Sequence, residues 1–429
     1  MILKLIWKDI MAKTQDCTTL SLVSLGCAKN AVDLQVRAGD LLKQGCVLSP
    51  DPDRADIVLV NTCAFIASAR EEAEREIRRA LELKRRGAYG AVVVTGCYPE
   101  RYPKARAAFP GVDIWEGVPQ TWVEPKLPGF RLTGPAFAYL KIAEGCAHRC
   151  AYCAIPAIRG KYRSRPMASI LREARALLSS GCRELNVVAQ DPMLYGIDLK
   201  DSSGKHPTLV DLLWKLDRLK GDFWIRVLYS YPSEISEAFI DWLNHARHAV
   251  KYVDVPLQHT VREILIGMNR KSAVTASRVA AEALRVAVPG VTLRTTIMTG
   301  FPGETPTRFR RLLADLDRMQ FDHLGAFAFS PEEGTKAARL AGRPSRRVAE
   351  AREAEVMARA EALWKIRSRQ WIGRRCRALV VAEGVARLES QAPDVDGVVF
   401  LKGAADIGSF VEVIIRRVKG FDFVAEVVS

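Results

Sequence analysis

The sequence predicts a multidomain α/β protein: an N-terminal parallel α/β domain, a central partial (β/α)6 barrel and a small C-terminal antiparallel β-barrel. Over most of the chain, short apolar runs alternate with amphipathic helical patterns, as in parallel sheets covered by helices. After residue 369 short β-rich pieces are separated by Gly, Pro and Asp, a texture typical of a small barrel. We expect domains at 19–125, 132–368 and 369–429.

Length, composition and charge narrow the class of protein. A chain of 429 residues with 48% hydrophobic and 26% charged residues should form two or three globular domains. Lys4, Lys8 and Asp9 interrupt the first apolar run before it reaches signal-peptide length, and no later run approaches the ~20 residues of a spanning helix. Ten cysteines are too few for a disulfide scaffold and indicate a reducing compartment, so we expect a cytoplasmic protein without a membrane partner. The net charge of +15 fits a nucleic-acid or ribonucleoprotein partner and simple solubility equally well.

Three successive strand–helix units in the first domain carry a cysteine at the same place. The predicted strands end two or three residues before Cys27, Cys63 and Cys97, which are 36 and 34 residues apart. Ligands bind at this edge of open α/β sheets, and three thiolates there would hold an iron–sulfur cluster with one iron left open. Small buried cysteines at strand ends are the alternative. The remaining cysteines are expected to be structural: Cys17, Cys46, Cys182 and Cys376.

A proline-rich segment at 111–135 is expected to link the first domain to the second. Helical patterns such as 169–180 and 273–286 separate the strands that follow. The predicted strands are 137–142, 184–190, 223–229, 252–258, 293–299 and 324–329. Because six βα units form a partial barrel, its functional residues are expected at the carboxyl ends of these strands.

A loop after the first barrel strand carries Cys146, Cys150 and Cys153 at the spacing C-x3-C-x2-C. Such a loop can wrap three thiolates around three irons of a cubane cluster. The fourth iron would then be open, and an open metal position indicates chemistry rather than structure. A zinc loop or a set of buried free thiols is the alternative.

This spacing resembles the radical S-adenosylmethionine (SAM) superfamily, in which SAM binds the open iron and is cleaved to a 5′-deoxyadenosyl radical. Tyr152 matches a position that lies beside the adenine in that superfamily. The resemblance also implies SAM contacts at the ends of the second, fourth and fifth strands. The candidates are Gln190, Asp191, Gln258, Arg294, Gly300 and Glu304. His148 and His259 are expected to be structural, and the alternating basic stretch 159–165 either meets a carboxylate or is a solvated face.

The order of parts resembles the methylthiotransferase family from about residue 19 to the end, and the last domain of that family is called TRAM. SLVSLGCAKNAVD at 21–33, TGFPGET and FSPEEGT are similar to its signatures. The resemblance implies two [4Fe-4S] clusters, one SAM that donates a methyl group and another that generates the radical. It also implies an electron donor such as flavodoxin or ferredoxin.

Family branches differ in substrate. VVAQDPMLYGID at 187–198 and the opening SLGCAKNAVD resemble the branch that methylthiolates the β-carbon of an aspartate in ribosomal protein S-twelve, although Pro192-Met193 departs from its usual Thr-Thr. The last 62 residues hold nine basic and eight acidic side chains, and a barrel that grips RNA should be more basic. We therefore expect S-twelve or the small ribosomal subunit as partner. The alternatives are a tRNA methylthiotransferase acting on an anticodon-adjacent adenosine and a non-catalytic iron–sulfur sensor or RNA-binding protein.

Overall fold

The structure is a computed structural model that describes residues 18–200 and 204–428, apart from the side chains of 275–280. Cys17 and the predicted leader lie outside these residues. The chain divides into two compact units. The first unit contains the chain up to Leu132 together with 144–147 and 153–162, and the second contains the rest. The cysteine loop at 146–153 therefore contributes residues to both units.

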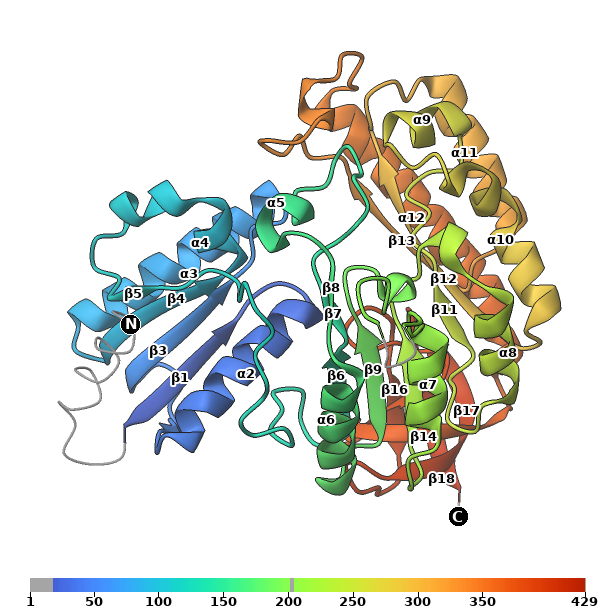
Figure 1. The fold of residues 1–429 in the computed structure, drawn as a ribbon. Coiled ribbons are helices and arrows are strands. Elements are labelled where there is room, and N and C mark those ends of the chain that lie inside the picture. The colour runs from blue at the N-terminus through green and yellow to red at the C-terminus, as the bar shows by residue number, and fades with distance from the viewer. Residues whose placement is uncertain (1–17, 201–203, 429) are drawn as a thin grey trace. The chain divides into compact units, whose positions relative to one another are not determined.

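The first unit is built on a five-stranded parallel sheet in the order β2-β1-β3-β4-β5 (Figure 1). Its strands are β1 (Thr19–Ser24), β2 (Val47–Leu48), β3 (Ala55–Thr62), β4 (Tyr89–Gly96) and β5 (Ile114–Trp115). Ser24, Asn61 and Thr95 are partners in register, so the three central strands end level with one another. This register places the predicted cysteines at one edge of the sheet.

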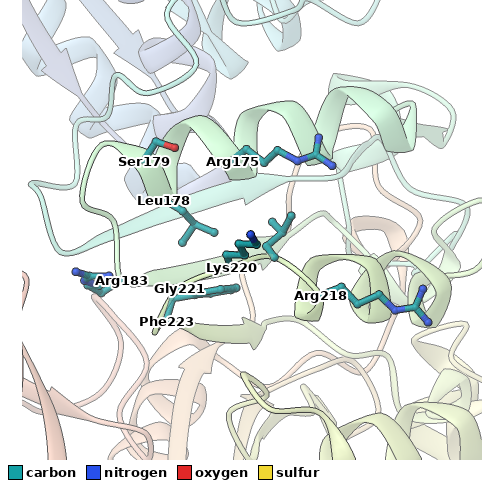
Figure 2. A pocket seen from close by; sticks show the side chains of 9 residues that line it. Arg175, Leu178, Ser179, Arg183, Arg218, Lys220, Gly221 and Phe223 are labelled. Carbon is teal, nitrogen blue, oxygen red and sulfur yellow. The ribbon is translucent and has the colours of Figure 1, made fainter.

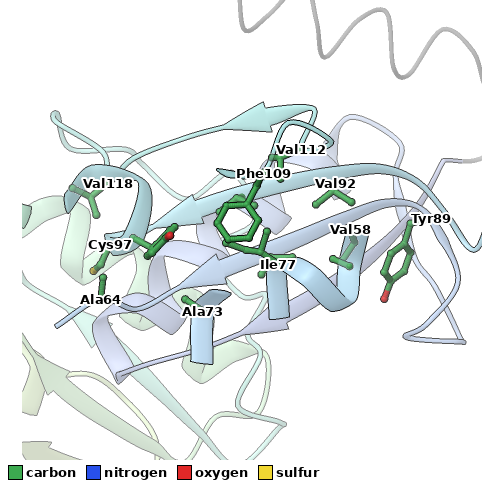
Figure 3. Close-up of a cluster of buried hydrophobic side chains, with 14 of the residues drawn as sticks. Val58, Ala64, Ala73, Ile77, Tyr89, Val92, Cys97, Phe109, Val112 and Val118 are labelled. Carbon is green, nitrogen blue, oxygen red and sulfur yellow. The ribbon is translucent and has the colours of Figure 1, made fainter. Parts of the chain in front are cut away.

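Helices cover both faces of this sheet because its strands are apolar on both sides. Leu34 and Ala38 of α2 (Ala28–Lys43) pack with Ile57 of β3 in one cluster. On the opposite face, Ile77 of α3 (Ala67–Arg85) packs with Val58, the next residue of the same strand (Figure 3). Two further short helices are α4 (Cys97–Arg101) and α5 (Ile155–Arg159), and η1 (Pro103–Ala108) is a 3-10 helix. Cys46 lies in the first of these clusters, as expected for a structural cysteine.

The second unit contains the six predicted barrel strands in two three-stranded parallel sheets, β10-β9-β6 and β11-β12-β13. They are β6 (Phe137–Lys141), β9 (Glu184–Val188), β10 (Trp224–Val227), β11 (Tyr252–Asp254), β12 (Thr292–Thr299) and β13 (His323–Ala328). Three strands end at least two residues earlier than predicted: β9 at Val188, β10 at Val227 and β11 at Asp254. β10 ends before Tyr229 and β11 before Gln258, and both of these residues have positive φ, which is incompatible with an extended strand.

Helices separate the barrel strands, as the periodicity predicts (Figure 1). They are α6 (Met167–Ser179), α7 (Leu209–Asp217), α8 (Glu237–His245), α9 (Arg262–Gly267), α10 (Ala273–Ala287), α11 (Pro306–Met319) and α12 (Arg346–Ser368). Two-residue strands β7 (Ala143–Glu144) and β8 (Arg163–Ser164) flank the cysteine loop. Cys182 is fully buried, and its thiol donates to the Glu184 carbonyl at 3.2 Å. In the described part of the chain, no helix combines the length and the apolar composition that crossing a membrane requires.

The predicted C-terminal barrel is confirmed as a closed five-stranded barrel in the order β14-β15-β16-β18-β17. Its strands are β14 (Arg375–Ala382), β15 (Val385–Leu388), β16 (Val399–Lys402), β17 (Phe410–Lys419) and β18 (Asp422–Val428). It is mixed rather than purely antiparallel, because β16 and β18 run parallel. Strand direction cannot alternate all the way around a closed ring with an odd number of strands, so one parallel pair is required.

A buried ionic cluster fixes the small C-terminal barrel to the amino-terminal ends of the six parallel strands, which we call the larger barrel. The carboxylate of Glu184, the first residue of β9, accepts hydrogen bonds from Arg226 at 2.7 Å and from Arg387 of β15. All three side chains are almost completely buried. Because a buried charge without a partner is costly, this cluster ties the two barrels together.

Two tyrosine–aspartate pairs extend the same contact. The hydroxyl of Tyr139 donates to Asp394 at 2.5 Å, and that of Tyr252 donates to Asp396 at 2.7 Å. Both aspartates belong to the loop between β15 and β16. This loop therefore contacts one strand of each three-stranded sheet, β6 through Tyr139 and β11 through Tyr252.

Candidate active site

The sheet of the first unit brings three cysteines to its carboxyl edge. Cys63 directly follows β3, Cys97 begins α4 after β4, and Cys27 follows β1. Gly26 makes the close approach of two of these loops possible: its φ is +95°, and a Cβ atom there would lie 2.7 Å from the Cβ of Cys63. The spacing predicted from the sequence is thus realised as adjacent loops.

Asparagine side chains hold these loops together. The amide of Asn30 in α2 donates to the carbonyls of Leu25 at 2.7 Å and Thr62 at 3.2 Å. Asn61 donates in turn to the Asn30 carbonyl at 2.7 Å. These bonds join the start of α2 to the ends of β1 and β3, which fixes the positions of Cys27 and Cys63.

A buried guanidinium lies against the cysteines. Arg159, the last residue of α5, is only 1% exposed. Its Nη1 atom contacts Asp33 Oδ2 at 2.7 Å and Glu144 Oε2 at 3.0 Å. Its Nη2 atom donates to Asn30 Oδ1 at 3.1 Å and to Cys97 Sγ at 3.3 Å. Two carboxylates therefore anchor the cation, and its other side faces a thiol.

The three thiols are in unequal electrostatic environments. Burial raises the pKa of the Cys97 thiol to about 12, and it also raises the pKa of Cys63. Cys27 is exposed, and although desolvation raises the pKa of its thiol, the charges of Lys29 and Arg159 outweigh it and lower that pKa. The positive charge of Arg159 favours the thiolate at all three positions. Three thiolates next to the fixed positive charge of Arg159 suit a bound group that carries a net negative charge together with its thiolate ligands.

These residues fit an iron–sulfur cluster better than a single ion. Among the residues that the structure describes, no group of three or more His, Cys, Asp or Glu side chains is arranged to hold one metal ion. A cubane cluster is larger, so its thiolate ligands lie further apart than the ligands of zinc. Three thiols at one sheet edge, with the Arg159 guanidinium bonded to Cys97, have the ligand chemistry of such a cluster.

The loop that carries Cys146, Cys150 and Cys153 has stabilising contacts within each of the two units. In the first unit, the Ile155 amide donates to Cys153 Sγ at 3.4 Å. In the second unit, Arg270 Nη1 lies 3.8 Å from Cys150 Sγ, and its guanidinium sits over the Tyr231 ring at 4.2 Å. The loop thus has an amide donor against Cys153 and a guanidinium against Cys150.

His148 has a defined structural role that its place between the cysteines did not reveal. Its Nε2 atom lies 2.6 Å from Asp191 Oδ2, and its ring stacks on Tyr231 with centroids 3.9 Å apart. Asp191 also accepts from the Met193 amide at 3.0 Å. The predicted cofactor residue Asp191 thus orients the cysteine loop from the carboxyl end of β9.

Gln258 has the clearest features of a ligand contact in the second unit. Its backbone is bonded to β12 on both sides, with its amide donating to Thr296 and its carbonyl accepting from Met298. The residue has φ of +67° and is 9% exposed. Its side-chain oxygen has no hydrogen-bond partner among residues 18–200 and 204–428. Buried acceptors are almost always satisfied, so this atom points to a donor on a bound molecule.

Tyr152 and Gln190 are placed near the expected edge as well. Tyr152 packs against an apolar cluster that includes Met298 and Phe301, at the end of β12. Gln190 follows β9 directly before Asp191. Both residues therefore lie beyond the ends of strands, and their contact with SAM stays a prediction.

Gly300 and Glu304 shape the loop after β12. Glu304 is 3% exposed and accepts from the Gly300 amide at 2.9 Å and from Arg352 at 2.7 Å. His259 Nε2 lies 3.2 Å from the same carboxylate. A Cβ at Gly300 would lie 2.2 Å from the Cβ of Ala349. Both residues are engaged in holding the loop, and His259 is structural as expected.

Arg294 is not brought together with the other candidates. It lies near the amino-terminal end of β12 and pairs with Asp254 at 3.1 Å and with Asp396 at 3.5 Å. Six residues of extended strand, roughly 20 Å, separate it from Gly300. Its surroundings are the contact with the small barrel.

Comparison with known proteins identifies the family of this chain. Sequence models match residues 19–117 (uncharacterized protein family UPF0004), 140–316 (radical SAM superfamily) and 372–428 (TRAM domain). The ribosomal protein uS12 methylthiotransferase RimO of Syntrophus aciditrophicus is 39% identical, over 96% of this chain and 99% of its own length. RimO of Geobacter sulfurreducens is 38% identical over 96% and 98%. The chain belongs to the RimO family.

RimO of Moorella thermoacetica, 38% identical over 95% of this chain and 99% of its own length, extends the same match. As a RimO family member the chain is a radical SAM methylthiotransferase. Among solved structures, the radical SAM methyltransferase TsrM of Kitasatospora setae matches with a TM-score of 0.53 at 18% identity, over 75% of this chain and 77% of its own. The likeness to TsrM concerns the fold alone.

Proposed function

We propose that this enzyme attaches a methylthio group to the β-carbon of an aspartate in ribosomal protein uS12. The chain matches three RimO relatives over nearly their whole length, and their names specify uS12 as substrate. The observation that carries the methylthio-transfer part of the proposal is the cysteine edge of the first unit, where Arg159 contacts Cys97 and its charge acts on Cys27 and Cys63. A simple radical SAM hydrogen-abstracting enzyme would not need this second donor set.

We assign one [4Fe-4S] cluster to Cys146, Cys150 and Cys153 and a second to the three strand-end cysteines. When bound, the clusters and SAM supply one-electron chemistry, a methyl group and a carrier for sulfur. The domain boundaries 19–125, 132–368 and 369–429 remain our proposal for the three parts. In this proposal, the role of the first domain is to hold the second cluster.

The chain's own residues hold and orient these groups. Asn30 and Asn61 fix the loops that carry the strand-end thiols, and Arg159 compensates their negative charge. Gln258 offers a buried acceptor to SAM, and Tyr152 offers an aromatic wall. Asp191, Gly300 and Glu304 hold the surrounding loops, and Gln190 lies at the same strand-end edge.

Partners follow from the reaction. A ribosomal-protein substrate places the enzyme in the cytoplasm, and a low-potential protein such as flavodoxin or ferredoxin would reduce the cluster. The enzyme would encounter uS12 either as the free protein or within the small ribosomal subunit.

The proposal is tested by mass spectrometry of uS12 and of total tRNA nucleosides from cells with and without the gene. We expect loss of the mass increment of one S–CH3 group in place of hydrogen from uS12 alone. Loss of a methylthiolated adenosine with unchanged uS12 would assign the enzyme to tRNA instead. Complementation with Cys63→Ala should fail to restore the uS12 modification.

A further inference from the structure

A hollow of about 510 Å³ lies in the second unit between α6, α7 and the loops that lead into β9 and β10 (Figure 2). Four of its lining residues are basic: Arg175, Arg183, Arg218 and Lys220. No acidic side chain is among the residues that line it. Figure 2 shows that these cations come from different elements, with Arg175 on α6, Arg218 at the end of α7, and Arg183 and Lys220 on the segments that lead into β9 and β10. The hollow is therefore a concentrated positive site.

Three of these cations are not neutralised. Arg175, Arg218 and Lys220 are exposed and form no ion pair or side-chain hydrogen bond with the described residues. Arg183 is partly buried and donates to the main-chain carbonyl of Asp222 at 3.4 Å. Unpaired guanidinium groups around a concave surface are ready-made donors for phosphate or carboxylate.

A second hollow in the first unit provides an internal comparison. It has a volume of about 590 Å³ and is also lined by two arginines and one lysine: Arg78, Lys84 and Arg85. There every cation has a carboxylate partner, with Arg78–Glu74 at 3.2 Å, Lys84–Asp113 at 2.6 Å and Arg85–Glu82 at 2.5 Å. The uncompensated charge is thus particular to the first hollow and not a general result of a basic sequence.

Helix capping does not account for these cations. Basic residues often stabilise the last turn of a helix through its dipole. Arg218 caps the carboxyl end of α7, but α6 has no basic residue in its last turn, and Lys220 lies beyond α7. Capping therefore explains one cation of the four.

We propose that this basic hollow, defined by Arg175, Arg183, Arg218 and Lys220, binds the phosphodiester backbone of RNA. The inference rests on the proposed function, because a ribosomal-protein substrate is assembled on RNA. Phe223, the aromatic residue at the hollow, is 1% exposed and stacks on His248 at 3.9 Å. No aromatic face is left at the hollow for stacking a base, so the backbone is the part of RNA that these residues recognise.

The location of the hollow suits a docking site. Arg183 precedes β9, whereas the SAM candidates Gln190 and Asp191 follow it. Seven residues of extended chain, roughly 23 Å, separate the two ends. RNA held at the amino-terminal end of the strands leaves the carboxyl edge open for an aspartate side chain.

The test compares two variants of the full-length protein that lose the same three charges. The pocket variant is Arg175→Gln/Arg218→Gln/Lys220→Gln, and the matched control is Arg78→Gln/Lys84→Gln/Arg85→Gln. Binding of a fluorescein-labelled single-stranded RNA is measured by anisotropy as a function of salt. We expect the pocket variant to bind about tenfold or more weakly and the salt slope to fall by about 2, since single strands contribute about 0.7 per phosphate contact. The control variant should bind like the wild type.

Two results would overturn the proposal. The first is RNA binding that is unchanged in the pocket variant or equally weakened in both variants. The second is a pocket-dependent binding of poly-glutamate in place of RNA, which would assign the hollow to an acidic protein segment. Inorganic phosphate at matched ionic strength should compete with RNA only in proteins with an intact hollow. RNA binding is measured on the full-length protein with its clusters in place and without SAM or uS12, so its failure is distinguishable from failure of the methylthiolation proposal, which is read by mass spectrometry of uS12 from cells.

Discussion

The Nη2 atom of Arg159 lies 3.3 Å from the Sγ atom of Cys97, and the guanidinium is anchored on its other side by Asp33 and Glu144. This relationship places a fixed positive charge against the thiol set of the first unit. A charge in this position should stabilise a reduced, more negative cluster relative to an oxidised one. We propose that Arg159 acts as a positioning residue for the second cluster.

Arg159→Gln should therefore lower the reduction potential of the second cluster. The change is on the order of tens of millivolts, because the two carboxylates partly offset the charge that is removed. The measurement is a redox titration followed by electron paramagnetic resonance in a Cys146→Ala/Cys150→Ala/Cys153→Ala background, which isolates the second cluster. Arg159→Lys keeps the charge and should retain most of the potential. A potential unchanged in Arg159→Gln would contradict an electrostatic role.

Gly26→Ala should prevent assembly of the cysteine edge. The new Cβ would sit at φ of +95° and 2.7 Å from the Cβ of Cys63, so both strain and overlap oppose it. We expect a loss of about 1–3 kcal/mol in the free energy of unfolding and iron content reduced by up to half. Gly45→Ala is the matched control: its φ is +101°, but nothing lies within 4 Å of the added atom. If both variants lost iron equally, backbone strain alone would be responsible.

Gln258→Met should weaken SAM binding without affecting stability. The substitution removes a buried acceptor that has no partner within the described chain, so the fold loses no hydrogen bond. Losing one hydrogen bond to a ligand costs about 1–1.5 kcal/mol, or roughly tenfold in Kd. Calorimetric titration of the reconstituted protein with SAM measures it.

Arg294→Met should give the opposite pattern. Its ion pairs with Asp254 and Asp396 lie at the contact with the small barrel, so the free energy of unfolding should fall while SAM affinity is retained. A large loss of SAM affinity in this variant, with stability intact, would return Arg294 to the cofactor pocket.

Acid should loosen the contact between the two barrels of the second unit. Desolvation opposes the charge of Glu184, but Arg387 and Arg226 outweigh it and hold the pKa of this carboxyl below its usual 4.5. A group whose pKa is lower in the folded than in the unfolded state stabilises the fold above the unfolded pKa. That contribution is lost as pH falls below about 4.5 toward the lowered value.

Glu184→Gln tests this assignment. At pH 7 the variant should be less stable by about 3–5 kcal/mol, because two buried guanidinium groups lose their carboxylate. Its free energy of unfolding should then fall less steeply than that of the wild type below pH 4.5. Urea unfolding at a series of pH values measures both effects, and parallel curves would exclude Glu184 as the titrating group.

Much of this architecture was predictable because its signals are local. The strand–helix alternation, the cysteines at strand ends and the change of texture after residue 369 are each visible within a short window. The position of Arg159 was not. Its stretch, 159–165, alternates basic residues, and the structure buries Arg159 and Arg165 while Lys161 is exposed. The partner that decides this for Arg159, Asp33, is 126 residues earlier in the chain.

Arg294 illustrates the same limit. A resemblance places a residue on a strand, but only the register shows which end of the strand it occupies. Its partners in register are His323, the first residue of β13, and Asp254, the last residue of the three-residue strand β11. The carboxylate it meets from the small barrel, Asp396, is about a hundred residues away and carries no motif that would have announced the contact.

The loop that bears Asp394 and Asp396 makes the terminal barrel a poor candidate for domain shuffling. A chimaera whose new terminal domain lacked counterparts of Asp394, Asp396 and Arg387 would leave Tyr139, Tyr252 and Glu184 without their partners. The amino-terminal end of the larger barrel is therefore matched to the side chains of this particular terminal barrel. Exchanging the terminal barrel would therefore call for matching substitutions at the Tyr139, Tyr252 and Glu184 contacts of the larger barrel.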